Sequence, residues 1–190
     1  MALKPSISVC LNNKCDVLTL TDTTGLYAAI TNPTGWGSPN EDTDKLQSAY
    51  VYVYDSTGNL IHTYDVLSQI INPAIDDMPL GTQSWQNNDG VYSFVYSVES
   101  AADGTIYTSD TVTEFFYCRL LNCIEEEKLK IVGTCDLVKL EKIKNNIDTL
   151  EIFLYGAKSA FACGNFAQVA TIMETASALC TQLDNCGCGC

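Results

Sequence analysis

The chain has 190 residues, with 23 Asp or Glu, 10 Lys or Arg and one His, so its formal net charge at pH 7 is −13. Nucleic-acid affinity depends largely on Lys and Arg that neutralise phosphates, so this charge argues against a DNA- or RNA-binding surface, and it also disfavours anionic membranes. With 46% hydrophobic and only 17% charged residues, we expect a folded chain with an apolar core rather than a disordered one.

The acidity is concentrated in the first part of the chain, which also has the pattern of β-strands. Residues 1–118 contain 14 Asp or Glu and 3 Lys, whereas residues 119–190 are close to neutral. Alternation is clear in Tyr50–Tyr54, where the tyrosines share one face and the valines the other. The expected strands are 6–10, 16–21, 26–30, 49–55, 60–64, 91–98 and 105–118. Turn residues between them predict an antiparallel β-sandwich of about seven strands, immunoglobulin-like or jelly-roll-like.

Two longer loops, 32–40 and 71–85, interrupt the expected strands, and each contains one tryptophan. Prolines and glycines exclude regular structure from the first loop. Long loops on a compact sandwich are common places for partner contacts, and Trp is enriched where protein surfaces meet. We therefore predict that Trp36 and Trp85 are interface residues.

The hydrophobic period becomes helical after Cys118. Residues 119–132 predict a short helix, and from Leu137 apolar residues spaced three and four apart predict a longer one that ends near Cys163. Asn165 and Gln168 form a capping pattern that begins a further helix, so a helical hairpin is expected. We place Leu140 and Ile147, on the apolar stripe, among the interface residues. The predicted class is α+β, with an acidic β-sandwich over 1–118, a helical domain over 119–184 and a Cys-Gly-rich tail over 185–190.

Catalytic signatures are missing from the sequence. His62 is the only histidine and lies in a strand-like run, and the motifs of P-loop, zinc-protease and serine-hydrolase sites are absent. The acidic groups at 41–44 and 76–77 allow general acid–base chemistry or calcium binding, but their spacing is not that of an EF-hand, and solvated acidic loops are the simpler interpretation. We predict that the protein is not an enzyme and has no cofactor.

The ten cysteines allow two interpretations. The C-x4-C pairs Cys10/Cys15 and Cys118/Cys123 have ligand types that suit a four-thiolate zinc site, although C-x2-C is the commoner spacing. The alternative, which we favour, is that the inner cysteines are small buried hydrophobes. The start of the chain has no apolar signal segment, so reduced thiols are expected. The inner cysteines are Cys10, Cys118, Cys163 and Cys180, and the weak metal candidates are the glycine-spaced Cys186, Cys188 and Cys190.

Three N-terminal segments, Ser8–Cys10, Cys15–Tyr27 and Asn32–Asn40, resemble virion proteins of tailed bacteriophages, particularly crAss-like phages. The strongest part is N-P-x-G-W-G-x-P-N. The resemblance implies a structural component of the neck or tail, repeated as a ring below the portal and helping to form the DNA channel. It implies a virion location after assembly in the host cytoplasm. The implied partners are further copies of the chain and other neck, tail and portal proteins, with no specific nucleic acid and no membrane.

A second function remains open at this stage. An acidic sandwich with aromatic residues also suits a carbohydrate- or Ca²⁺-binding module of a virion or cell-surface protein. In the ring interpretation the acidity has a use, because like charge on a channel wall lowers the affinity for passing DNA.

Overall fold

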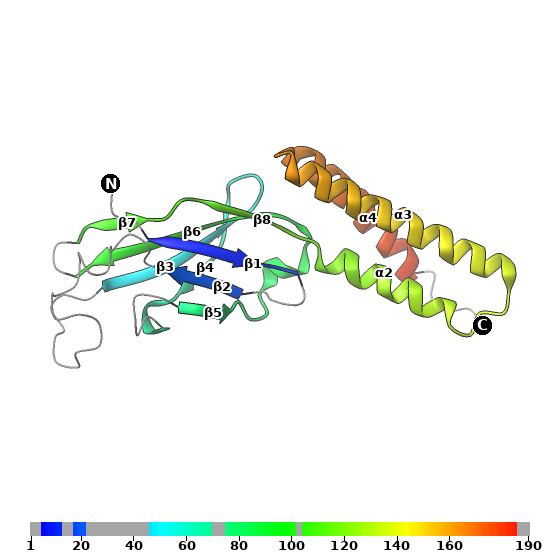
Figure 1. Cartoon of the computed structure of the whole chain (residues 1–190), viewed down its shortest axis with the longest axis horizontal. Helices are drawn as coiled ribbons and strands as arrows, with labels where there is room; N and C mark the ends of the chain where they lie inside the picture. The colour runs from blue at the N-terminus through cyan, green and yellow to red at the C-terminus, as the bar shows by residue number, and fades with distance from the viewer. Residues whose placement is uncertain (1–4, 13–16, 22–45, 70–74, 102–103, 186–190) are drawn as a thin grey trace. The chain divides into compact units, whose positions relative to one another are not determined.

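The computed structural model describes residues 5–12, 17–21, 46–69, 75–101 and 104–185. The chain divides into two compact units, a β unit and a helical unit, coloured by residue number in Figure 1. The β unit comprises Met1–Trp85 and Tyr92–Glu114, and the helical unit comprises Gln86–Val91 and Phe115–Cys190. The junction at Glu114 lies close to the expected boundary at residue 118. Gln86–Val91 belongs to the helical unit, which the sequence did not predict.

The β unit contains two antiparallel sheets, as expected for the sandwich. The three-stranded sheet has the order β1-β2-β5, and the five-stranded sheet has the order β4-β3-β6-β7, with β8 also pairing with β6. The strands are β1 (Ser6–Cys10), β2 (Val17–Thr21), β3 (Leu46–Tyr54), β4 (Leu60–Asp65), β5 (Ile75–Pro79), β6 (Gly90–Ser100), β7 (Ile106–Thr108) and β8 (Val112–Phe116). The α+β class with an N-terminal β-sandwich is therefore confirmed.

Alternation of side chains decides which face of each strand is buried. In β3 the small and branched residues are buried and the tyrosines are half-exposed, as the sequence predicts. In β6 every second residue from Tyr92 onward is buried, and Phe94 and Tyr96 have no exposed surface. Ile7 and Met78 are buried from the other sheet. Apolar side chains of both sheets thus form the core.

Two differences from the expected strands have local causes. Strand β5 lies within the loop expected over 71–85, at an edge of its sheet, where a proline such as Pro79 is tolerated. The strand expected over 105–118 is divided into β7 and β8. Between them, the Ser109 Oγ accepts a hydrogen bond from the Tyr96 backbone N–H at 2.9 Å, taking the place of a backbone acceptor. The strand expected over 26–30 lies outside the described residues.

The helical unit contains α2 (Cys118–Ile131), α3 (Leu137–Ala162) and α4 (Phe166–Asn185), so the predicted hairpin with a preceding helix is confirmed. Asp136 caps α3, because its Oδ1 accepts the N–H of Val138 at 2.9 Å. Asn165 accepts the N–H of Gln168 at 3.2 Å, which is the predicted cap of α4. Among the helices in the described part of the chain, none combines the length and hydrophobicity that crossing a bilayer requires.

The predicted apolar stripe of α3 forms the centre of the helical core. The core also includes side chains of α2, α4 and the segments before α2. Its fully buried members include Leu150, Ala157, Val169 and Ala176. The small side chains of Ala157 and Ala176 let α3 and α4 pack closely.

Candidate functional site: a bracing cluster in the helical unit

The predicted interface residues have different environments in the structure. Trp85 is 5% exposed, and its Nε1 donates to the Tyr64 hydroxyl at 3.3 Å inside the β unit. Ile147 is 7% exposed in the helical core, and Leu140 is half-buried on α3. Trp36 lies outside the described residues. Trp85 and Ile147 are therefore core residues within the protomer, and other side chains form its surface.

The other predicted positions give no reactive site among the described residues. His62 is half-exposed on β4, with its ring edge-on to Tyr64 and the centroids 4.4 Å apart, which is the environment of an ordinary strand residue. Outside the described residues lie the segments 41–44 and 186–190, the latter including Cys186, Cys188 and Cys190. No side chain is described for Asp76 or Asp77 in β5.

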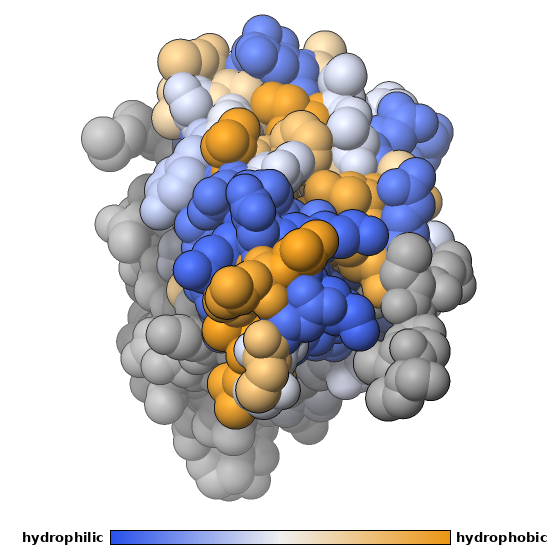
Figure 2. Space-filling view, turned by 90° about the vertical axis from the view of Figure 1, so that its right-hand side faces the viewer, coloured by the Kyte–Doolittle hydropathy of each residue, from blue (hydrophilic) through white to orange (hydrophobic). Residues whose placement is uncertain are grey.

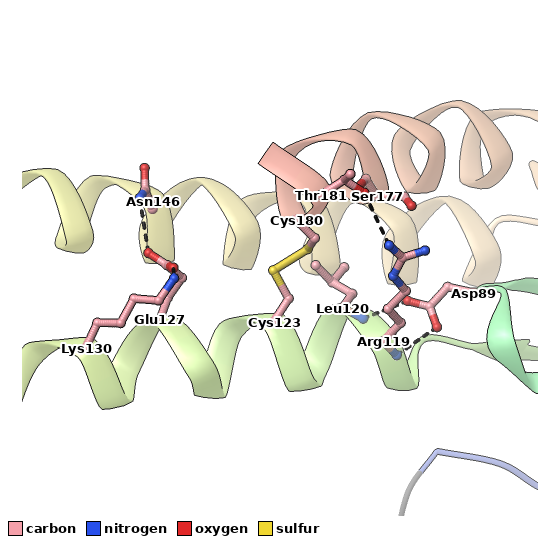
Figure 3. The surroundings of a disulfide bond; sticks show 10 residues. All are labelled: Asp89, Arg119, Leu120, Cys123, Glu127, Lys130, Asn146, Ser177, Cys180 and Thr181. Carbon is pink, nitrogen blue, oxygen red and sulfur yellow. Dashed lines mark hydrogen bonds and ion pairs between the residues drawn. A yellow bond between two sulfur atoms is a disulfide. The ribbon is translucent and has the colours of Figure 1, made fainter. Parts of the chain in front are cut away.

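A disulfide joins α2 to α4 between Cys123 and Cys180, two residues that are 57 positions apart with Cα atoms 6.0 Å apart (Figure 3). The expectation of reduced inner thiols is therefore wrong for Cys180, and Cys10 is disulfide-bonded as well. The four-thiolate zinc site is also wrong, since disulfide sulfurs are not thiolate ligands. The physical reason is that packing of α4 on α2 brings together two buried cysteines whose separation suits a disulfide.

Two further inner cysteines differ from the expectation of buried hydrophobes. Cys163, which follows α3, is exposed, and Cys118 at the start of α2 is half-buried. Only Cys180 of the four inner cysteines is buried, and it is covalently paired. Cys10 is exposed. Spacing along the sequence did not show which cysteines the helices would bring together.

Asp89 caps α2 from a distant position in the chain. Its Oδ1 accepts the backbone N–H of Arg119 at 2.9 Å, and its Oδ2 accepts that of Leu120 at 2.7 Å. These N–H groups belong to the first turn of α2, where a helix has no internal acceptors. Burial raises the pKa of Asp89, because loss of solvation outweighs the two N–H bonds and the Arg119 charge, which act in the opposite direction. This cap explains why Gln86–Val91 belongs to the helical unit.

The Arg119 side chain extends from α2 to α4, where its Nη2 donates to the Thr181 hydroxyl at 3.2 Å. Thr181 in turn donates to the backbone carbonyl of Ser177 at 2.9 Å. A cavity of about 280 Å³ lies beside these groups, and its lining includes Asp89, Leu120, Met173, Glu174 and Cys180. Two of its charged lining residues connect elements: Asp89 connects the segment before α2 to α2, and Arg119 connects α2 to α4.

Glu127 is the one buried Asp, Glu, Lys, Arg or His side chain among the described residues, at 2% exposed. Its neighbours Glu125 and Glu126 are exposed on the same helix. Its carboxylate accepts hydrogen bonds from the Lys130 ammonium and, at 3.1 Å, from the Asn146 amide of α3. Pairing with a cation and an amide makes its burial tolerable.

We call Asp89, Arg119, Cys123, Glu127 and Cys180 the bracing cluster, because their contacts connect separate segments of the helical unit. Both oxygens of Asp89 accept helix N–H groups, Glu127 is paired, and the two sulfurs of Cys123 and Cys180 are oxidised. Within the described ranges, no group of three or more His, Cys, Asp or Glu is arranged to hold a metal ion.

Comparison with known proteins adds no assignment. The chain matches no family model, no curated protein and no solved structure.

Proposed function

We propose that the chain is a structural component of a tailed-phage virion that assembles as a ring in the neck or tail below the portal. The resemblance of residues 32–40 and the neighbouring segments to crAss-like phage virion proteins supplies the type of assembly. The helical unit supplies the physical support, because its buried polar groups and its disulfide connect helices to one another. Cross-connected helices keep their surfaces in fixed positions, which a subunit repeated by symmetry requires.

The observation that carries the proposal is exposed apolar surface on the helical unit. Six large apolar side chains of its helices and of the turn between α2 and α3 are more than two-thirds exposed: Leu129, Val132, Leu137, Val138, Ile152 and Tyr155. Grouped apolar surface of this kind marks protein–protein contacts in soluble proteins. An assembling protomer explains why these residues are not polar.

The acidity of residues 1–118 fits a channel through which DNA moves. Like charge on the lumen weakens adhesion of the phosphate backbone, so DNA passes without being bound. In this proposal the acidic segments face the lumen, with Asp42, Asp44, Asp76 and Asp77 as the residues concerned. A structure of the assembled particle with these four residues on the outer surface would remove this part of the proposal.

Native mass spectrometry of the full chain tests the proposal, because it reports copy number and bound metal together. We expect a discrete oligomer of identical copies that grows in population with protein concentration. A protein that stays monomeric at all concentrations would contradict the ring.

A second function is supported by one observation. Tyr50, Tyr52 and Tyr54 form a half-exposed row on β3, with the first two ring centroids 6.1 Å apart. Tyrosine rings on a flat sheet are suitable for stacking against sugar rings. Glycan binding by a monomer, lost in a Tyr50→Ala, Tyr52→Ala variant, would favour this module over the ring.

A further inference from the structure

The end of the helical unit where α2 ends and α3 begins carries an exposed aliphatic cluster. We name it the apolar tip and define it by Leu129, Val132, Leu137 and Val138, which are 69%, 82%, 79% and 78% exposed. Figure 2 looks at this end and shows apolar surface surrounded by hydrophilic side chains. Exposure of this extent leaves most of each side chain in water, so burying them against a partner is favourable by about 25 cal/mol per Å².

Five of the ten basic residues of the chain lie near the apolar tip, in residues 128–144. Two of them are already paired within the protomer, Lys128 with Glu125 and Glu151, and Lys130 with Glu127. Asp136 is engaged as the cap of α3. The other three basic residues are the ones that a partner's carboxylates could pair with.

Three of these lysines, Lys139, Lys142 and Lys144, lie on exposed positions of α3. Of the ion pairs that the structure shows among described residues, none includes them. Lys139 lies in the first turn of α3, where the positive end of the helix dipole disfavours a cation. A carboxylate of a partner beside Lys139 would make this placement more favourable.

The β unit of a second copy of this chain is an acidic surface that could serve as the partner. Residues 1–118 contain 14 acids against 3 lysines; Asp65 and Asp110 are exposed on the β unit, and Asp55 is half-exposed. We propose that the apolar tip of one copy docks on the acidic β-sandwich of a second copy, with Lys139, Lys142 and Lys144 facing its carboxylates. This inference rests on the ring proposal and names the contact that closes the ring.

The contact is heterologous, since two different surfaces meet. Repetition of such a contact produces a ring when the rotation between copies closes and an open filament when it does not, whereas a contact between identical surfaces produces a two-fold dimer. Burial of the apolar tip would contribute to the affinity of the contact. The lysines would orient the two copies and raise the rate of association. The association is therefore expected to weaken as salt is raised.

Cross-linking of the full chain tests the contact directly. A mixture of ¹⁵N-labelled and unlabelled protein is treated with a carbodiimide, which joins lysines to nearby carboxylates without a spacer. We expect mixed-label cross-links from Lys139, Lys142 or Lys144 to Asp or Glu of the β unit. Mixed-label cross-links between two tips would overturn the inference. So would an associated protein whose mixed-label cross-links include none of these three lysines.

Variants separate this inference from the ring proposal. Leu137→Ser with Val138→Ser should weaken association about 10-fold or more, whereas Ile152→Ser, which removes an exposed apolar side chain of α3 outside the apolar tip, should weaken it much less. Lys139→Glu with Lys142→Glu should weaken it as well, and circular dichroism checks that each variant keeps its helices. A wild-type oligomer that both tip variants preserve would overturn the inference and leave the ring standing. A monomeric wild type would overturn both.

A membrane is the competing partner for an apolar and basic surface. Vesicles containing phosphatidylserine are mixed with the wild-type protein and floated on a density gradient. Flotation that the Leu137→Ser, Val138→Ser variant abolishes would overturn docking on a second copy. Protein that remains at the bottom supports it.

Discussion

The β unit and the helical unit are stabilised by different kinds of contact. In the β unit, alternating strands bury apolar and aromatic side chains between two sheets, and Trp85 and Phe94 are in the centre. In the helical unit, a disulfide, the Asp89 cap and the buried Glu127 connect segments that are far apart in sequence. The stability of the β unit therefore depends mainly on the volume of its buried side chains. That of the helical unit also depends on particular pairs of residues. Side-chain truncation and pair removal are therefore expected to act on different units.

The largest effect is expected from Phe94→Ala in the β unit. Phe94 has no exposed surface and contacts Trp85 with the ring centroids 6.1 Å apart, so its removal leaves a cavity that should cost about 4 kcal/mol. Urea unfolding followed by tryptophan fluorescence measures this, because both tryptophans precede residue 86. Tyr52→Ala, on the half-exposed face of β3, is the control and should cost about 1 kcal/mol. Equal losses for the two variants would contradict the assignment of the buried face.

Removal of the disulfide with Cys123→Ser and Cys180→Ser should destabilise the helical unit. A loop closed over 57 positions predicts a loss of about 4 kcal/mol in the chain-entropy model. The helical signal in circular dichroism should melt at lower temperature, while the tryptophan signal changes less. Cys163→Ser, which alters an exposed thiol, is the matched control. An unchanged helical melting temperature in the double variant would be evidence against a bracing role.

The buried carboxylate should matter more than its neighbour two residues away. Glu127→Ala leaves the Asn146 amide and the Lys130 ammonium without their acceptor and should cost about 2 kcal/mol. Glu125→Ala removes only an exposed ion pair with Lys128 and should cost about 0.5 kcal/mol or less. Denaturant unfolding of the two variants side by side measures the difference, which would vanish if Glu127 were solvated.

The smallest effect concerns Asp89, and it depends on pH. Asp89→Ala removes the cap of α2 and should cost about 1 kcal/mol. Burial raises the folded-state pKa of Asp89 above the ordinary value of 3.8, so ionisation of this carboxyl lowers stability. Its contribution is most favourable below pH 3.8 and declines as pH rises through the folded-state pKa. Relative to Asp89→Asn, the wild type should therefore become less stable across that range. Thermal unfolding at several pH values measures it, and an opposite slope would contradict the raised pKa.

Local signals made much of the fold predictable. The tyrosine and valine alternation of β3 gave its buried face, the three-and-four spacing gave Leu150 and Leu154 as core residues, and Asn165 gave the start of α4. Each of these depends on neighbours within a few residues. Strand β5 was missed because its proline and two aspartates resemble a loop, and its pairing with β2 is a long-range contact.

The bracing cluster was not predictable for the same reason. Asp89 and Leu120 are 31 positions apart, and a capping carboxylate is recognisable from sequence only when it lies next to its helix. The sequence Asn88–Gly90 resembles a hairpin turn, which concealed the cap. Cys123 has several possible partners in a chain with ten cysteines, and only the packing of α4 on α2 selects Cys180.

Electron cryomicroscopy of the concentrated full-length protein tests the ring most directly. The account predicts class averages with rotational symmetry, in which identical copies surround an open channel and the helical unit of each contacts the β unit of the next. Particles of monomer size at every concentration, or two-fold dimers without a channel, would contradict it.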